Sequence, residues 1–328
     1  MSRDIGELAL FGGVPALRAI GTGSPHRRQA IADGLRDVFD RRYFANNGPL
    51  VQRLDRSLAE VTGTRHAICT ANPAAAWLIL GKALGLVSPL VLPVLGPRSL
   101  AAVTAWTGLT PAYGDVSSDD GALARLFDGP TLHPAATVHL LDLPGGISTA
   151  GGACITTDDD RLAADLKARR AFHPTPQPIG LRLNGKMSEG QAAVALAGLA
   201  ELRSQGMDER ACLAAFAGAL GPDVGLQPMA AVDRTLPRAA CRLRVAEGHD
   251  LDAADYCRIL KAEGLPCGGL EWAAAVDPDT YPGAVRARAV LFEVAIGHST
   301  AEAAAVGAFI RGVALAARRI RAGLGARP

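Results

Sequence analysis

Short apolar runs alternate with helix-like segments across residues 66–141, and this alternation constrains the fold more than any other feature of the chain. The predicted strands are residues 66–70, 89–95, 110–113 and 136–141. Between the first two strands, Asn72 is suited to cap a helix and Pro73 to occupy its first position. Strands that alternate with helices predict an α/β fold with parallel pairing and right-handed crossovers.

The pattern changes after about residue 224, where a second unit of mixed strands and helices is expected. Its predicted strands are residues 239–245 and 289–294, and its predicted helices are residues 251–263 and 300–324. We therefore divide the chain into three parts. They are an irregular N-terminal arm along the surface (1–25), a large domain (26–205) and a small C-terminal α+β domain (206–328).

Composition excludes several classes of protein. Hydrophobic residues make up 49% of the chain and charged residues 20%, as expected for a globular protein. The net charge of +2 does not indicate the strongly basic surface that binds nucleic acid. The six cysteines form no CxxC pair, so no metal site is predicted. No apolar run reaches the length of about 18 residues that spans a membrane, and we expect a soluble, cytoplasmic protein.

Residues 140–157, LLDLPGGISTAGGACITT, contain two Gly-Gly pairs followed by an apolar run. Gly151 and Gly152 predict a turn that leads into a short buried strand with Cys154 in the core. The three acids at residues 158–160 favour the start of a helix, where the helix dipole stabilises negative charge. Adjacent acids cannot all converge on one ion, so a metal site is the weaker interpretation.

Five stretches, in order along nearly the whole chain, together resemble the DegT/StrS family of sugar aminotransferases. They are FGGVPA (11–16), RRYFANNGPLVQRLDRSLAEVTGTRHAI (41–68), TAWTGLTPAYGDV (104–116), GGACITTDDDRLAADLKARRAF (151–172) and LNGKMSEGQAAVAL (183–196). The resemblance implies the fold type I architecture of enzymes that use pyridoxal phosphate (PLP). We therefore expect an aminotransferase-like, mostly parallel sheet with central units deleted, plus the small C-terminal domain.

The family's chemistry requires a lysine that forms a Schiff base with the cofactor. The resemblance places this lysine seven residues before Gly151, where the chain has Pro144. A proline has no amine and cannot replace it. The chain contains four lysines, none at the end of a predicted strand of the large domain: Lys82, Lys167, Lys186 and Lys261.

The resemblance also implies a phosphate site at a helix start, completed by an asparagine from the neighbouring subunit. Asn72 and Ala74 stand at this helix start, and Pro73 and Ala74 remove a backbone donor and a hydroxyl from it. Asn184, the residue lent to the neighbour, is retained. We expect Asn72, Ala74 and Asn184 to form a vestigial site that holds no cofactor.

Other chemistry remains open near the shortened region. His139 and Asp142 are the candidate catalytic residues of a PLP-independent enzyme, joined in a looser constellation by His133 and His173. The alternative is that these are separate strand-end and surface residues, since they lack metal-ligand spacing. Asp142 has two further interpretations, as the partner of the cofactor's ring nitrogen or as a turn residue before Pro144.

Two further segments bear on a possible site. The GGISTAGG loop (145–152) is either an anion-binding turn or only a flexible link. Its Ser148 and Thr149 lack the GxSxG pattern of hydrolases. Glu271 and Trp272 fall where the resemblance implies a substrate pocket.

The leading hypothesis is a degenerate DegT/StrS homologue that cannot carry out PLP-dependent transamination. It would act as a homodimer, or as a non-catalytic partner or regulator of an active paralogue, in amino-sugar or other secondary-metabolite biosynthesis. A PLP-independent enzyme of such a pathway, acting on a small-molecule ligand, is the alternative.

Overall fold

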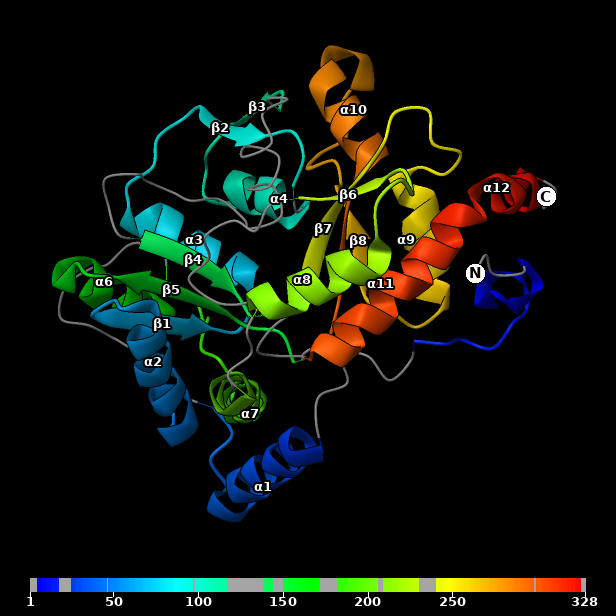
Figure 1. The fold of residues 1–328 in the computed structure, drawn as a ribbon. Helices are drawn as coiled ribbons and strands as arrows, with labels where there is room; N and C mark the ends of the chain where they lie inside the picture. Colours follow the sequence, from blue (N-terminus) through cyan, green and yellow to red (C-terminus); the bar gives the residue numbers. More distant parts are fainter. Residues whose placement is uncertain are drawn as a thin grey trace.

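The computed structural model shows two groups of strands and helices that lie side by side (Figure 1). It describes residues 5–17, 25–45, 47–96, 98–116, 138–143, 150–171, 182–205, 209–229, 240–297 and 299–325. The predicted α/β organisation of the first part of the chain and the α+β organisation of the last part are confirmed.

The larger group contains a three-stranded sheet in the order β1–β5–β4. Its strands are β1 (His66–Thr70), β4 (Val138–Asp142) and β5 (Ala153–Thr157). The central strand β5 runs antiparallel to both neighbours, with Cys154 opposite Cys69 on one side and Leu141 on the other. The expectation of parallel pairing throughout is therefore wrong for β5.

The length of the link between β4 and β5 explains this correction. A parallel crossover needs about a dozen residues or more, whereas antiparallel neighbours are joined by short turns. Residues 143–152 connect the two strands, and the Leu143 N–H donates to the Gly152 carbonyl at 3.2 Å to begin the turn. The short link thus specifies an antiparallel pair.

Helices cover both faces of this sheet (Figure 1). The alternation of β1 sends Ala67 and Cys69 toward α2 (Pro49–Thr62) and α7 (Glu189–Gln205). Ile68 packs on the other face with residues of α3 (Pro73–Ala83) and α6 (Asp160–Ala171). β1 lies at one edge of the sheet, between α2 and α6.

A separate two-stranded parallel sheet contains β2 (Leu90–Pro93) and β3 (Pro111–Gly114), joined through α4 (Arg98–Trp106). Leu92 packs with Trp77 of α3 and Val103 of α4. Among the described residues no ladder joins these strands to β1–β5–β4. This division is consistent with a sheet that has lost its central strands. The predicted helix at residues 119–127 lies outside the described residues.

The smaller group is a four-stranded antiparallel sheet in the order β6–β7–β9–β8. The strands are β6 (Leu226–Pro228), β7 (Ala240–Val245), β8 (Cys267–Gly269) and β9 (Leu291–Ala295). The accompanying helices are α8 (Glu209–Leu220), α9 (Ala253–Ala262), α10 (Pro282–Val290), α11 (Thr300–Leu315) and α12 (Ala317–Gly325). At the centre of the core, Tyr256 of α9 stacks on Phe292 of β9 with ring centroids 5.3 Å apart.

The helix predicted for residues 300–324 is two helices, because α11 ends at Leu315 and α12 begins at Ala317. No single helix in the described part of the chain is long and apolar enough to cross a membrane; α11 and α12, bent by 67°, meet this criterion of length and composition only as a pair.

The N-terminal arm forms two short 3-10 turns, at Ile5–Glu7 and Ala9–Phe11. It is anchored more deeply than a surface arm, because Leu8 and Leu17 are buried in the core of the smaller group. Glu263, which is fully buried, accepts hydrogen bonds from the backbone N–H groups of Ala9 and Ala16, each at 2.8 Å. α1 (Pro25–Arg41) follows the arm and packs on α7 through a buried Arg27–Glu201 ion pair.

Contacts near the ends of β2 and β3 join the two groups. The Asp115 carboxylate, at the end of β3, accepts hydrogen bonds from the N–H groups of Gly283 and Ala284 at the start of α10. Burial acts to raise the pKa of Asp115, but these hydrogen bonds outweigh it and hold the pKa below its ordinary value. Leu95, just after β2, forms an isolated antiparallel bridge with Trp272.

The carboxylate of Glu263 gives a direct test of the anchored arm. In Glu263→Gln one of the two acceptor oxygens becomes an amide that faces a backbone N–H, and we expect a loss of about 1–3 kcal/mol in the free energy of unfolding. Urea denaturation measures the loss, and limited proteolysis should show faster cleavage before residue 17. The exposed Glu247→Gln is the matched control. Equal stability of the two variants would contradict the anchoring role.

Candidate functional site

The Gly151-Gly152 turn packs against the end of β1 and the segment that precedes α7. Gly152 has φ +108°, and a Cβ there would lie 2.5 Å from Met187 Cε and 3.7 Å from the Thr70 carbonyl oxygen. Gly151 has φ +75°. The predicted turn is thus confirmed, and its second glycine is required both by the backbone conformation and by close packing.

Gln191 of α7 ties these segments together. Its Nε2 donates to the carbonyl oxygens of Ala71 at 3.0 Å and Ala150 at 3.2 Å, and its Oε1 accepts from the Ser188 N–H at 3.1 Å. The Ala71 N–H donates to the Gly185 carbonyl at 2.9 Å. The end of β1, the glycine turn and the NGKMSEGQ segment (184–191) therefore form one hydrogen-bonded unit.

The start of α3 leaves little capacity to bind a phosphate. The Asn72 Oδ1 accepts from the Ala75 N–H at 2.8 Å, so Asn72 caps its own helix as predicted. The Ala76 N–H is also taken, by the Asn72 carbonyl at 3.2 Å. Pro73 has no N–H and Ala74 no hydroxyl, and the Ala74 N–H is the remaining amide of this first turn.

Asn184 is exposed, whereas the next residue, Gly185, is buried against Ala75, Ile79 and Leu183. The structure therefore fixes the backbone on one side of Asn184 and leaves its side chain at the surface. This placement is compatible with the contribution to a neighbouring subunit that the resemblance implies.

The four lysines all lie in described residues, and none of their recorded contacts is with the glycine turn or the start of α3. Lys82, on α3, donates from Nζ to the carbonyl oxygen of Thr107, which directly follows α4. Lys167 and Lys186 line a cleft beside β1 that contains neither Asn72, Ala74 nor Gly152. Lys261 lies on α9, in the smaller group.

The candidate catalytic residues are placed only in part. His139 pairs with Thr156 and Asp142 with Ala153 in the β4–β5 ladder. Their side chains lie outside what the structure describes, as do Pro144, Ser148, Thr149, His133 and His173. The predicted roles of His139 and Asp142 therefore stay predictions.

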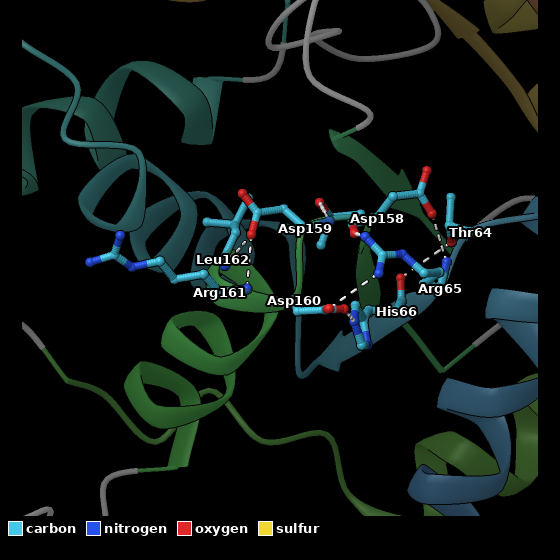
Figure 2. Close-up of polar contacts among 9 residues, drawn as sticks. Thr64, Arg65, His66, Asp158, Asp159, Asp160, Arg161 and Leu162 are labelled. Carbon is cyan, nitrogen blue, oxygen red and sulfur yellow. Dashed lines mark hydrogen bonds and ion pairs between the residues drawn. The ribbon is translucent and has the colours of Figure 1, made fainter.

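Figure 2 shows that the acids at residues 158–160 point to separate partners. Asp158 Oδ1 accepts from the Arg65 N–H at 2.8 Å, and Asp159 Oδ1 accepts from the N–H groups of Arg161 and Leu162 at the start of α6. Asp160 bonds His66 Nε2 at 2.7 Å and Arg65 Nη1 at 3.1 Å. The helix-start interpretation is confirmed, and the described residues contain no cluster suited to a metal ion.

The Asp160 carboxylate is held in its charged form by these neighbours. The hydrogen bond with His66 and the charge of Arg65 lower the pKa of Asp160 below its ordinary value. Asp158 and Asp160 thus join the start of α6 to Arg65 and His66 at the start of β1, whereas Asp159 caps α6 (Figure 2).

Two other predicted residues have structural roles. Cys154 is fully buried in the core between the sheet and α2 and α7, as expected. Trp272 packs with Leu95 in the satellite core that joins the two groups, and the Arg288 guanidinium lies 5.3 Å from its ring centroid. Glu271 is exposed, and its carbonyl accepts from the Gly96 N–H at 2.9 Å.

Sequence reasoning missed Glu189 and Gln191. Glu189 is buried, and its two oxygens accept from the N–H groups of Leu50 and Val51 at 2.8 and 3.0 Å, which caps α2 from a distant part of the chain. Pro49 at the start of α2 signalled a helix start without a local cap residue, but nothing in the sequence shows which carboxylate supplies the cap.

The fold and part of the sequence match known proteins. Residues 25–125 match the DegT/DnrJ/EryC1/StrS aminotransferase family, and this part of the chain carries that family's sequence signature. No curated protein matches the chain.

Solved structures of several enzymes are similar over nearly the whole chain. One is DesI in the presence of its TDP-sugar product, with a TM-score of 0.75 and 21% identity over 98% of this chain and 100% of that one. Another is 3-amino-5-hydroxybenzoic acid synthase, with a TM-score of 0.69 and 15% identity over 93% and 100% of the two chains. A putative sugar aminotransferase of Streptococcus pneumoniae, in its PMP form, has a TM-score of 0.69 and 14% identity over 94% and 98%. The predicted aminotransferase-like fold is confirmed.

The residues at the start of α3 do not fit the cofactor that this fold implies. A phosphate at a helix start is held by free backbone N–H groups and hydroxyls. Here the proline, the alanine and the self-capping Asn72 leave one amide. The start of α3 therefore lacks the donors with which such a site holds the phosphate of PLP.

The glycine turn predicts different costs for its two glycines. Gly152→Ala would hold an alanine at φ +108° and would require the Met187 methyl and Leu143 to shift, and we expect it to destabilise the protein by about 2–3 kcal/mol. Gly151→Ala has φ +75° and no close contact, since the nearest atom would lie 3.8 Å away, and should cost about 1 kcal/mol. Urea unfolding of both variants measures the difference, and equal costs would show that the conformation and surroundings of Gly152 are no more restrictive than those of Gly151.

Proposed function

We propose that this chain is a homologue of the DegT/DnrJ/EryC1/StrS aminotransferases that does not carry out PLP-dependent transamination. It acts as a non-catalytic dimer partner or regulator of an active paralogue in amino-sugar or other secondary-metabolite biosynthesis. The fold and the match over residues 25–125 support the relationship to sugar-modifying enzymes.

One observation carries the proposed loss of transamination: the start of α3 and the position of the Schiff-base lysine lack groups that the chemistry needs. Pro144 stands at the position of that lysine. Of the lysines that are present, Lys82 donates to the Thr107 carbonyl, Lys167 and Lys186 line the cleft beside β1, and Lys261 lies on α9. Proline replaces a donor, and alanine a hydroxyl, at the start of α3. These changes affect two separate requirements, namely the covalent bond to the cofactor and the binding of its phosphate.

The proposed role as a partner rests on what is retained. The fold keeps the hydrogen-bonded unit formed by Thr70–Ala71, the glycine turn and residues 184–191. Its exposed Asn184 occupies the position that, by the resemblance, completes a neighbour's phosphate site. A chain that retains Asn184 but has no working cofactor site of its own can still complete the phosphate site of an intact neighbouring subunit.

The setting in biosynthesis is inferred from the similar structures. The crystal structure of DesI contains a TDP-sugar product, and that of GDP-4-keto-6-deoxymannose-3-dehydratase contains GDP-perosamine. We propose that the paralogue served by this chain acts on a related activated sugar.

Borohydride trapping tests the proposed loss of the covalent cofactor. The purified chain is mixed with equimolar PLP, reduced, digested and analysed by mass spectrometry after an absorbance scan. We expect the absorbance of free PLP and no saturable pyridoxyl adduct, because Pro144 stands at the position of the Schiff-base lysine. The same treatment of urea-unfolded chain controls for random modification. A stoichiometric adduct on Lys82, Lys167, Lys186 or Lys261 of the folded chain would contradict the proposal.

Co-expression with a complete paralogue from the same genome tests the partner role. We expect a complex whose transamination exceeds that of the paralogue alone, with Asn184→Ala weakening its PLP affinity by about tenfold or more through the loss of a hydrogen bond to a charged group. Gln227→Ala, at an exposed position of β6, serves as the comparison for a general loss of an amide. Turnover by the purified chain alone, abolished in His139→Ala or Asp142→Ala, would instead support a PLP-independent enzyme.

A further inference from the structure

A cleft of about 930 Å³ lies between α2, the edge of β1 and α6, apart from the vestigial cofactor site. Its walls include Asp55 and Arg56 of α2, His66 and Ala67 of β1, and Lys167 and Arg170 of α6. The volume is that of a small-molecule site.

The cleft is strongly cationic although the whole chain carries a net charge of only +2. Five cationic side chains line it, against two carboxylates. The cations are Arg56, Arg65, Lys167, Arg170 and Lys186, and the carboxylates are Asp55 and Glu60. This concentration of one sign within a concave surface attracts anions.

Arg170 and Asp55 form a fixed floor. Arg170 Nη1 donates to the Cys69 carbonyl and Nη2 to Asn47 Oδ1, each at 2.7 Å, and Asp55 Oδ1 accepts from the Cys69 N–H at 2.8 Å. The two side chains thereby satisfy the outward backbone groups of an edge strand, which would otherwise pair with another chain. Arg170 is only 4% exposed, so its position is fixed by packing.

The floor itself pairs one positive with one negative side chain, so the surplus of positive charge lies around it. Arg170 Nη1 lies 3.6 Å from Asp55 Oδ2, which forms an ion pair. Burial raises the pKa of Asp55 above its ordinary value, and the charges of Arg170 and Lys167 oppose that rise. The other carboxylate of the cleft, Glu60, is directed toward Arg203, which lies 3.2 Å away and outside the cleft.

Closing the edge strand explains Asp55 and Arg170 but not the cations around them. Lys167 and Arg56 are exposed, and Lys186 reaches the same cleft from the segment before α7. At the mouth, Arg65 is held by Asp160 and by the Asp158 carbonyl (Figure 2). Cations from four separate parts of the chain therefore converge on one concave surface.

We propose that this cleft binds a small phosphorylated molecule, with its phosphate oxygens held by Lys167, Lys186 and Arg56 above the Arg170 floor. Ammonium and guanidinium groups are the donors that proteins use for phosphate. The half-exposed Tyr43 at the rim offers an aromatic face for the remainder of the ligand.

Calorimetric titration with inorganic pyrophosphate and with inorganic phosphate tests the site. We expect saturable binding of pyrophosphate that weakens as salt is raised, with inorganic phosphate binding less tightly because it carries fewer contacts. Lys167→Met and Lys186→Met, which keep the apolar stems, should each weaken pyrophosphate by about tenfold through the loss of a charge-assisted hydrogen bond. A nucleoside monophosphate that binds more tightly than inorganic phosphate would show that the phosphate belongs to a nucleotide. Equal affinities would show that the site recognises the phosphate anion alone.

Lys261→Met, on the distant helix α9, is the matched control and should leave the affinity unchanged. Thermal unfolding of each variant checks that the fold is intact. The proposal is overturned by the absence of saturable pyrophosphate binding, or by an equal loss in Lys261→Met. It is also overturned by binding that survives in the Lys167→Met/Lys186→Met double variant.

Discussion

The buried antiparallel strand β5 is the element on which the larger part of this protein depends. All five of its residues are buried, and it pairs with β1 on one side and β4 on the other. Its entry is the Gly151-Gly152 turn, in which both glycines have the positive φ that other residues rarely adopt. The same turn is held by Gln191 to the end of β1, so the strand, the turn and the segment before α7 are fixed as one body.

The proposed loss of the cofactor site leaves this body in place. Asn72 caps its own helix, Pro73 has no N–H and Ala74 has no hydroxyl, so the Ala74 N–H is the remaining amide of the first turn. Gly152, Met187 and Gln191 join the sheet to α7, which gives them a structural role apart from any cofactor. On the outer side of β1, Arg170 and Asp55 bond the backbone of Cys69 and form the floor of a cationic cleft.

The sequence predicted local structure well, because local structure is set by neighbours in the chain. The strand at residues 66–70, the Asn72 cap and the helix after the acids at 158–160 follow from periodicity and capping chemistry. The direction of β5 was mispredicted, because alternation was taken to imply parallel pairing although the link at residues 143–152 is too short for a crossover. The cleft was out of reach, since Asp55, Arg170 and Lys186 meet only through the packing of α2 and α6 on β1. Likewise the Glu189 cap of α2 joins residues 138 positions apart, at which distance sequence spacing carries no information.

The central claim is that the start of α3 no longer binds the cofactor's phosphate, and pyridoxamine phosphate tests it most directly because this form needs no lysine. Its binding should be measured by calorimetry on the Lys167→Met/Lys186→Met chain, so that the cationic cleft does not contribute. We predict no saturable binding at pyridoxamine phosphate concentrations below about 1 mM. A single backbone amide and its neighbouring contacts supply only a few kcal/mol of binding free energy, which corresponds to a Kd of about 1 mM or weaker. Saturable micromolar binding that is abolished by Ala74→Glu would show that the helix start still holds the cofactor, and would contradict this account.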